Sequence, residues 1–111
     1  MRPEELKLLV DVRNALEEIR EFTAGMDFGA YKVDAKCRAA VERKFEIIGE
    51  ACMRLRDRFP EPFSKIDSGS QIIGFRNRLI HGYDNVDDAI VWDVVTRKLP
   101  ELTVQVDDLL T

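Results

Sequence analysis

One uninterrupted apolar stripe does most to limit the folds open to this chain. Between residues 33 and 59, apolar side chains recur every three or four positions: Val33, Cys37, Val41, Phe45, Ile48, Cys52, Leu55 and Phe59. This spacing puts all of them on one side of a single α-helix. Asp34 suits the N-cap, and Pro60 and Pro62 end the helix and open a loop that reaches to about Ser70. We therefore predict one long helix from about Asp34 to Phe59.

The N-terminal segment, from about Pro3 to Thr23, predicts a second amphipathic helix. Pro3 suits a first helical turn, and Glu4 and Glu5 favour the positive end of the helix dipole. The residues expected to face inward are Leu6, Leu9, Val12, Leu16, Ile19 and Phe22. Residues 24–30 then break the pattern with two glycines.

Two further helices are predicted in the C-terminal half. A short one runs from about Ser70 to Ile80, and Gly82 marks its end or a bend. The last runs from about Asp87 to Leu110, and Pro100 is expected to kink or split it. In the first of these helices, the residues expected to face inward are Ile72, Phe75 and Leu79. In the second they are Ile90, Val91, Val94, Val95, Leu99, Leu102, Val106 and Leu109.

Four helices with short connections favour antiparallel neighbours. The predicted fold class is therefore all-α, an up-and-down helical bundle whose last helix is kinked at Pro100. A chain of 111 residues supports one hydrophobic core, so we expect a single domain over residues 1–111.

The charge balance limits the partners. With 21 acidic and 17 basic residues the net charge is −4, so RNA would have to be held by a local basic patch. No apolar run approaches the ~20 residues that span a bilayer, and Glu4 and Glu5 lie where a signal peptide would be apolar. The expected location is cytoplasmic. Cys37 and Cys52 lie roughly 22 Å apart along one predicted helix, too far for a disulfide.

The segment with the richest chemistry is Arg76-Asn77-Arg78-Leu79-Ile80-His81-Gly82-Tyr83, which holds the only histidine. Arg76 and Tyr83 are seven residues apart and share a face of a straight helix. His81 is about 140° away from Arg76, so the two meet only if the helix ends or bends near Gly82.

These residue types suffice for RNA cleavage without a metal. An imidazole can move a proton near neutral pH, and a guanidinium can stabilise the charge that develops on phosphate. One group deprotonates a ribose 2′-OH, whose oxygen attacks the adjacent phosphorus, and a second proton donor helps the 5′-oxygen leave. Because one chain has one histidine, a symmetric dimer would supply the second. Asn77 and Arg78 add donors for phosphate or base.

Structural explanations remain open for each of these residues. A histidine near a helix end can simply favour the dipole, Arg76 can pair with a glutamate such as Glu50, and Tyr83 can be a core-edge aromatic. Salt bridges on a solvated face explain Arg54, Arg56 and Arg58 as well as a basic groove does. Asp84, Asp87 and Asp88 fit turn and N-cap positions better than a metal site, so no metal or cofactor is expected.

The spacing Arg76-x4-His81-x-Tyr83 resembles the signature of the HepT-like toxin family of the HEPN superfamily. Residues 45–51 (Phe-Glu-Ile-Ile-Gly-Glu-Ala) resemble the family's second-helix pattern. Residues 80–87, Val91-Trp92 and residues 99–102 resemble its C-terminal half. Residues 63–70 depart from it, because they lack a tryptophan that many relatives carry there and are slightly long. This departure bears on the rim of the cleft and on substrate preference.

The resemblance implies a HEPN-type homodimer with the motif at the subunit cleft. It further implies the toxin of a prokaryotic toxin–antitoxin pair, a metal-independent endoribonuclease in which Arg76 and His81 are catalytic. The implied partner is an MntA-type nucleotidyltransferase antitoxin that can attach AMP to Tyr83. The alternatives are a non-catalytic HEPN module that binds a nucleotide or a nucleotidyltransferase, and a purely structural helical dimer.

Overall fold

The computed structural model describes residues 1–111, and every regular element in it is helical, which confirms the all-α class. The elements are α1 (Pro3–Thr23), α2 (Phe28–Val33), α3 (Ala35–Arg58), α4 (Pro60–Ser64), α5 (Gly69–His81), the 3₁₀ turn η1 (Tyr83–Asn85), α6 (Asp88–Asp93), the π-helical segment η2 (Val94–Lys98) and α7 (Leu99–Leu110).

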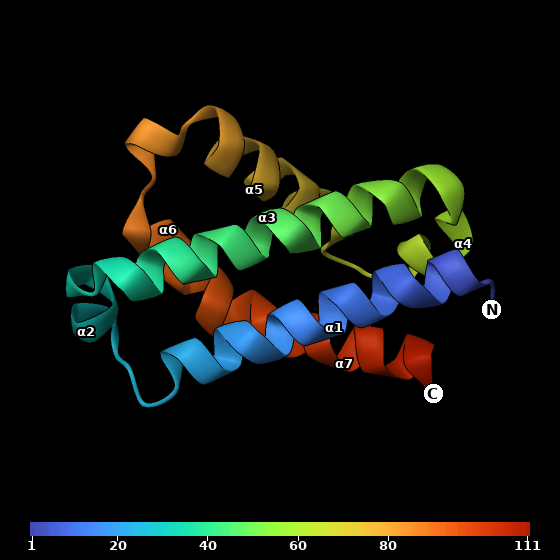
Figure 1. Ribbon diagram of the computed structural model, residues 1–111, viewed down its shortest axis with the longest axis horizontal. Helices are drawn as coiled ribbons and strands as arrows, with labels where there is room; N and C mark the ends of the chain where they lie inside the picture. Colours follow the sequence, from blue (N-terminus) through green and yellow to red (C-terminus); the bar gives the residue numbers. More distant parts are fainter.

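The four long helical runs alternate in direction, as an up-and-down bundle requires (Figure 1). Helices α1 and α3 cross the molecule side by side, α5 packs along α3, and α7 packs along α1. The short helices α2 and α4 lie at opposite ends, and both termini lie at the α4 end. The molecule measures 41 × 29 × 19 Å. None of its helices is both long and apolar enough to cross a membrane.

Two short helices occupy segments that were expected to be irregular. Asp27 caps α2 by accepting a hydrogen bond from the Ala30 N–H at 2.8 Å, and Pro60 opens α4 at a first-turn position. The stripe therefore begins on α3 at Cys37, and Val33, at the end of α2, is 82% exposed. The inward orientation predicted for Val33 was wrong because α3 starts two residues later.

Three more inward predictions fail at the edges of helices. Leu6 and Phe22 in α1 and Ile90 in α6 are exposed, and Leu8 is buried instead. Helix α1 lies between α3 and α7, so its buried arc is centred on Val12, Leu16 and their neighbours. A side chain near the margin of an amphipathic stripe is then left in solvent.

The break predicted at Pro100 is present in the last helical run. Between α6 and α7 the chain widens into the π-helical turn η2, and Pro100 follows in the first turn of α7. Proline has no N–H to donate and its ring crowds the carbonyl four residues back, so a regular α-helix cannot continue through it. The wider turn absorbs this conflict without ending the run.

The core is shared by the four long helical runs, and α3 packs against α1 and α5 within it. Val41, Phe45, Ile48 and Leu55 are completely buried, and the rings of Phe45 and Phe75 meet edge to face at 5.2 Å. The two cysteines are buried free thiols, as their spacing predicted. Burial raises the pKa of the Cys52 thiol to about 12, so it is not a nucleophile at neutral pH.

One corner of the fold brings acidic groups to a buried ring. Tyr31 of α2 is completely buried against Trp92 of α6, with ring centroids 5.1 Å apart, and its hydroxyl has no hydrogen-bond partner. Glu42 of α3 faces the same corner, and burial, then the charge of Asp88, raises the pKa of its carboxyl. Arg38, 3.7 Å from Asp88, opposes this shift.

Replacing Glu42 with glutamine is expected to stabilise the chain at pH 7–8 by a few degrees in Tm at most. A raised folded pKa means that the folded state holds the proton more tightly, so stability falls as pH rises through that pKa. Below the usual glutamate range the two proteins should melt alike, and above it the variant should be the more stable. Thermal unfolding from pH 3 to 8 measures this, with the exposed Glu21→Gln as control. A wild-type advantage at pH 8 would contradict it.

Candidate functional site

Helix α5 carries the motif and ends directly after it. Ile72, Phe75 and Leu79 anchor the helix to the core. The helix continues through His81, and the N–H of Gly82 closes it on the Arg78 carbonyl at 2.9 Å. Two other sides of α5, one next to α3 and one facing solvent, are therefore available for functional side chains.

A glycine on α3 sets how closely α5 can approach. A Cβ placed on Gly49 would lie 2.2 Å from the Cβ of Arg76 and 2.6 Å from its Cγ, so any side chain there would collide with the arginine stem. Gly49 is itself buried. Close contact of the two helices at this level therefore requires glycine, and it holds the base of Arg76 in place.

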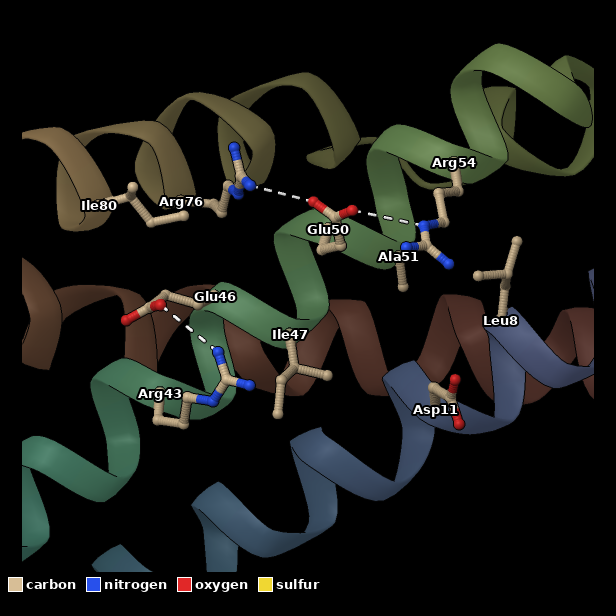
Figure 2. Close-up of a pocket in the computed structure, with 10 residues that line it drawn as sticks. All are labelled: Leu8, Asp11, Arg43, Glu46, Ile47, Glu50, Ala51, Arg54, Arg76 and Ile80. Carbon is tan, nitrogen blue, oxygen red and sulfur yellow. Dashed lines mark hydrogen bonds and ion pairs between the residues drawn. The ribbon is translucent and has the colours of Figure 1, made fainter.

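The guanidinium of Arg76 is held by neighbours on both helices. It donates to a Glu50 carboxylate oxygen at 3.0 Å and to the Asn77 side-chain oxygen at 2.8 Å. Arg54 donates to the other oxygen of Glu50 at 3.3 Å. Figure 2 shows this Arg76–Glu50–Arg54 row across the gap between α5 and α3. The pairing with Glu50 that was considered from the sequence is present, while the Nε of Arg76 is buried without a partner.

This row borders a cavity of about 350 Å³ among α1, α3 and α5 (Figure 2). Its walls are Leu8, Asp11, Arg43, Glu46, Ile47, Glu50, Ala51, Arg54, Arg76 and Ile80. Three arginines and three carboxylates balance one another in charge. An incoming phosphate would therefore compete with Glu50 for Arg76.

His81 opens onto a different hollow. Asn77, Arg78, His81, Gly82 and Asn85 enclose about 480 Å³ of open space without any apolar side chain. The imidazole is exposed and makes no hydrogen bond within the chain. A bound molecule in this hollow can therefore reach the imidazole directly.

The approach of Arg76 and His81 within one chain, considered for a bend at Gly82, does not occur. Because α5 stays helical through His81, the two side chains keep their separation of about 140° and line separate hollows. Asn77 connects the hollows, since its side chain accepts from Arg76 and lines the space beside His81.

Tyr83 lies just beyond the helix and is 79% exposed in η1. It does not share a helical face with Arg76, because the chain leaves α5 at Gly82. Its side chain is therefore open to solvent.

The other charged candidates have structural roles. Arg54 pairs with Glu50, Arg56 with Asp57 and Arg58 with Glu4, so the solvated-face explanation accounts for these arginines. Asp87 caps α6 at the Ala89 N–H, 2.9 Å away, and Asp88 faces Arg38. Nothing in the sequence predicted that Asn85 lines the His81 hollow. Nor did it predict that the stem of Arg76 packs against Gly49.

Comparison with known proteins places this chain in a family of ribonucleases. The model of the family described as "Ribonuclease HepT-like" matches residues 12–109, so the chain belongs to the ribonuclease HepT-like family. This confirms the resemblance and the ribonuclease class. No solved structure matches significantly.

In three relatives, the part that aligns with this chain makes up most of the relative's own length. A "Putative RNase" of Caldanaerobacter subterraneus subsp. tengcongensis is 36% identical over 85% of this chain and 83% of its own. A "Probable ribonuclease HepT" of Thermococcus cleftensis is 35% identical over 85% and 84%. A "Putative RNase" of Methanocaldococcus jannaschii is 31% identical over 89% and 90%.

Proposed function

We propose that this chain is a metal-independent endoribonuclease, the toxin of a prokaryotic toxin–antitoxin pair, in which Arg76 and His81 are catalytic. The observation that carries the proposal is the exposed, unbonded imidazole of His81 in a polar hollow beside Asn77 and Arg78. His81 takes the proton of a ribose 2′-OH or returns one to the leaving 5′-oxygen. Arg76 neutralises the charge that develops on the phosphate.

The separation of the two hollows supports a homodimer as the active form. One chain offers one imidazole and directs Arg76 away from it. A two-fold axis beside the motif would bring a second His81 and Arg76 to the same phosphate, so that one histidine serves as base and the other as acid.

Tyr83 is the proposed point of control by an MntA-type nucleotidyltransferase antitoxin. Its exposed side chain, two residues after His81, can attack the α-phosphate of ATP and take up AMP as pyrophosphate leaves, without any unfolding of the core. The added phosphate would bring negative charge to the edge of the hollow that Arg78 and His81 line. RNA would then be repelled from the site.

The decisive experiment is cleavage of a labelled RNA by purified wild-type protein in excess EDTA. Cleavage that EDTA does not slow supports the proposal, and products ending in 2′,3′-cyclic phosphate would identify the attacking 2′-OH. Adding the nucleotidyltransferase with ATP should stop cleavage by wild type but not by Tyr83→Phe. Wild-type protein that binds RNA without cleaving it would contradict the enzymatic role.

Arg78 is proposed to contact a phosphate beside His81. Replacing it with alanine should weaken RNA binding and reduce the slope of log Kd against log salt by about 1. Titration of RNA by fluorescence anisotropy at several salt concentrations measures the slope. Arg97→Ala, which removes another exposed arginine, is the control and should leave the slope unchanged. A parallel loss in both variants would mean that only overall charge matters.

A non-catalytic HEPN module that holds a nucleotide or a nucleotidyltransferase is the second candidate. The observation in its favour is that Glu50 already compensates Arg76, as expected of an arginine that serves a structural role. This candidate predicts a stable complex with the nucleotidyltransferase that Tyr83→Ala weakens, and no RNA turnover under any condition.

A further inference from the structure

The segment between α5 and α6 carries Tyr83 and Asn85 but has few contacts of its own. Its turn η1 packs against the end of α5, and the Asn85 N–H donates to the Gly82 carbonyl at 2.9 Å. The first side chain after α5 that is bonded within the chain is that of Asp87, which caps α6. The positions of Tyr83 and Asn85 therefore depend on how the two ends of this segment are held.

Arg38 holds the end of the segment at α6. Its guanidinium donates to the Lys32 carbonyl oxygen at the end of α2, and its Nε lies 3.7 Å from a carboxylate oxygen of Asp88 at the start of α6. Because Arg38 belongs to α3, this one side chain links three helices. The side chains of Arg38 and Asp88 are only 27% and 30% exposed, so salt and water screen their attraction less than that of a surface pair.

Arg38 also offsets a repulsion between α3 and α6. Burial, then the charges of Asp88 and Glu46, raise the pKa of the Glu42 carboxyl, whereas Arg38 lowers it. Glu42 belongs to α3 and Asp88 to α6, so their carboxylates repel across the two helices. Without Arg38, the attraction that holds the start of α6 would become a repulsion that pushes it away from α3.

We propose that Arg38 is a positioning residue for the motif. By neutralising the repulsion between Glu42 and Asp88, it holds the start of α6 and thereby places Tyr83 and Asn85 beside His81. The inference rests on the proposed function, because that function makes Tyr83 the point of control. Arg38 is bonded to no residue of the motif, so it acts only through the segment that follows α5.

The order of the segment tests this role without any enzyme assay. By NMR relaxation, the backbone amides of residues 83–87 should have order parameters of about 0.85 in the wild type and below about 0.6 in Arg38→Gln. Lys44→Gln is the matched control, because Lys44 is on the same helix, is 24% exposed and pairs with Glu18 of α1 at 3.0 Å. The two variants should lose similar amounts in Tm, but only Arg38→Gln should loosen the segment.

A second substitution tests the cause. Adding Glu42→Gln to Arg38→Gln removes the repulsion with Asp88, so the order parameters should return most of the way to the wild-type values. Failure of this rescue would overturn the proposal. So would unchanged order in Arg38→Gln, equal loosening in Lys44→Gln, or a wild-type segment that is already mobile.

Transfer of AMP to Tyr83 is the functional measurement. With the nucleotidyltransferase and ATP, kcat/KM for Arg38→Gln should fall about tenfold, because the acceptor is no longer held in place, and the double variant should recover. Transfer at the wild-type rate to a loosened segment would overturn the positioning role. If the wild type neither cleaves RNA nor takes up AMP, the proposed function fails, and the order parameters alone then decide whether Arg38 holds the segment.

Discussion

Replacing His81 with alanine is expected to lower RNA cleavage by about 10²- to 10⁴-fold, the usual contribution of a general acid or base. The imidazole is exposed, makes no hydrogen bond within the chain and lines the polar hollow at the end of α5. Its removal leaves the core contacts of α5 intact, because Phe75 and Leu79 provide them. Single-turnover cleavage in EDTA measures the loss at the chemical step.

A structural role for His81 predicts a different result. A histidine that serves only the helix dipole contributes at most about 1 kcal/mol at an exposed position, and its loss would lower Tm slightly without affecting cleavage. Lys32→Ala is the matched control, because Lys32 is an exposed basic residue in the last turn of α2. Equal cleavage by His81→Ala and Lys32→Ala would remove His81 from the mechanism.

The His81→Ala variant also tests whether the active form is a dimer. If each site uses one imidazole as base and another as acid, a mixed dimer of wild type and His81→Ala should be nearly inactive. Mixing an excess of inactive variant with wild type, after subunit exchange, should then lower activity well below the wild-type share. Activity in proportion to the wild-type share would mean that each chain works alone.

The sequence predicts the helices well because each has a periodic apolar stripe and chemical end signals. Pro3, Asp34 and Pro60 mark boundaries that the structure reproduces to within about two residues. The predictions of helices and of buried residues fail where the spacing of apolar residues carries no information. A six-residue helix such as α2 is too short to show a stripe, and whether Leu6 or Leu8 is buried depends on which neighbours flank α1.

The candidate site was predictable in composition but not in arrangement. The motif drew attention to Arg76, His81 and Tyr83, and angular spacing gave the separation of the first two. Three features depend on contacts between helices that are distant in sequence. They are the pairing of Arg76 with Glu50, the separation of the two hollows and the close packing of Arg76 on Gly49. The sequence does not show whether a helical glycine lies at a close contact between helices, so only the packed structure distinguishes Gly49 from Gly74 in α5, where an added Cβ meets nothing.

Replacing Gly49 with alanine is expected to destabilise the chain by about 3 kcal/mol, at the upper end for overpacking of a buried site. The new methyl group would lie 2.2 Å from the Cβ of Arg76 and 3.4 Å from the Ile72 carbonyl oxygen, so α5 must move away from α3 as a body. Chemical denaturation at fixed protein concentration measures the loss. Gly74→Ala is the stability control on the partner helix and should have the opposite sign, because its methyl group meets nothing.

The same displacement should reduce catalysis beyond the loss of folded protein. Movement of α5 separates Arg76 from Glu50 on α3, and a misplacement of about 1 Å near a reacting group can cost roughly 100-fold in rate. Rates per folded molecule, measured well below the Tm of the variant, isolate this effect from unfolding. A less stable variant that cleaves RNA at the wild-type rate would show that the Gly49 contact supports only the fold. Retention of wild-type stability would mean that α3 and α5 are not in such close contact.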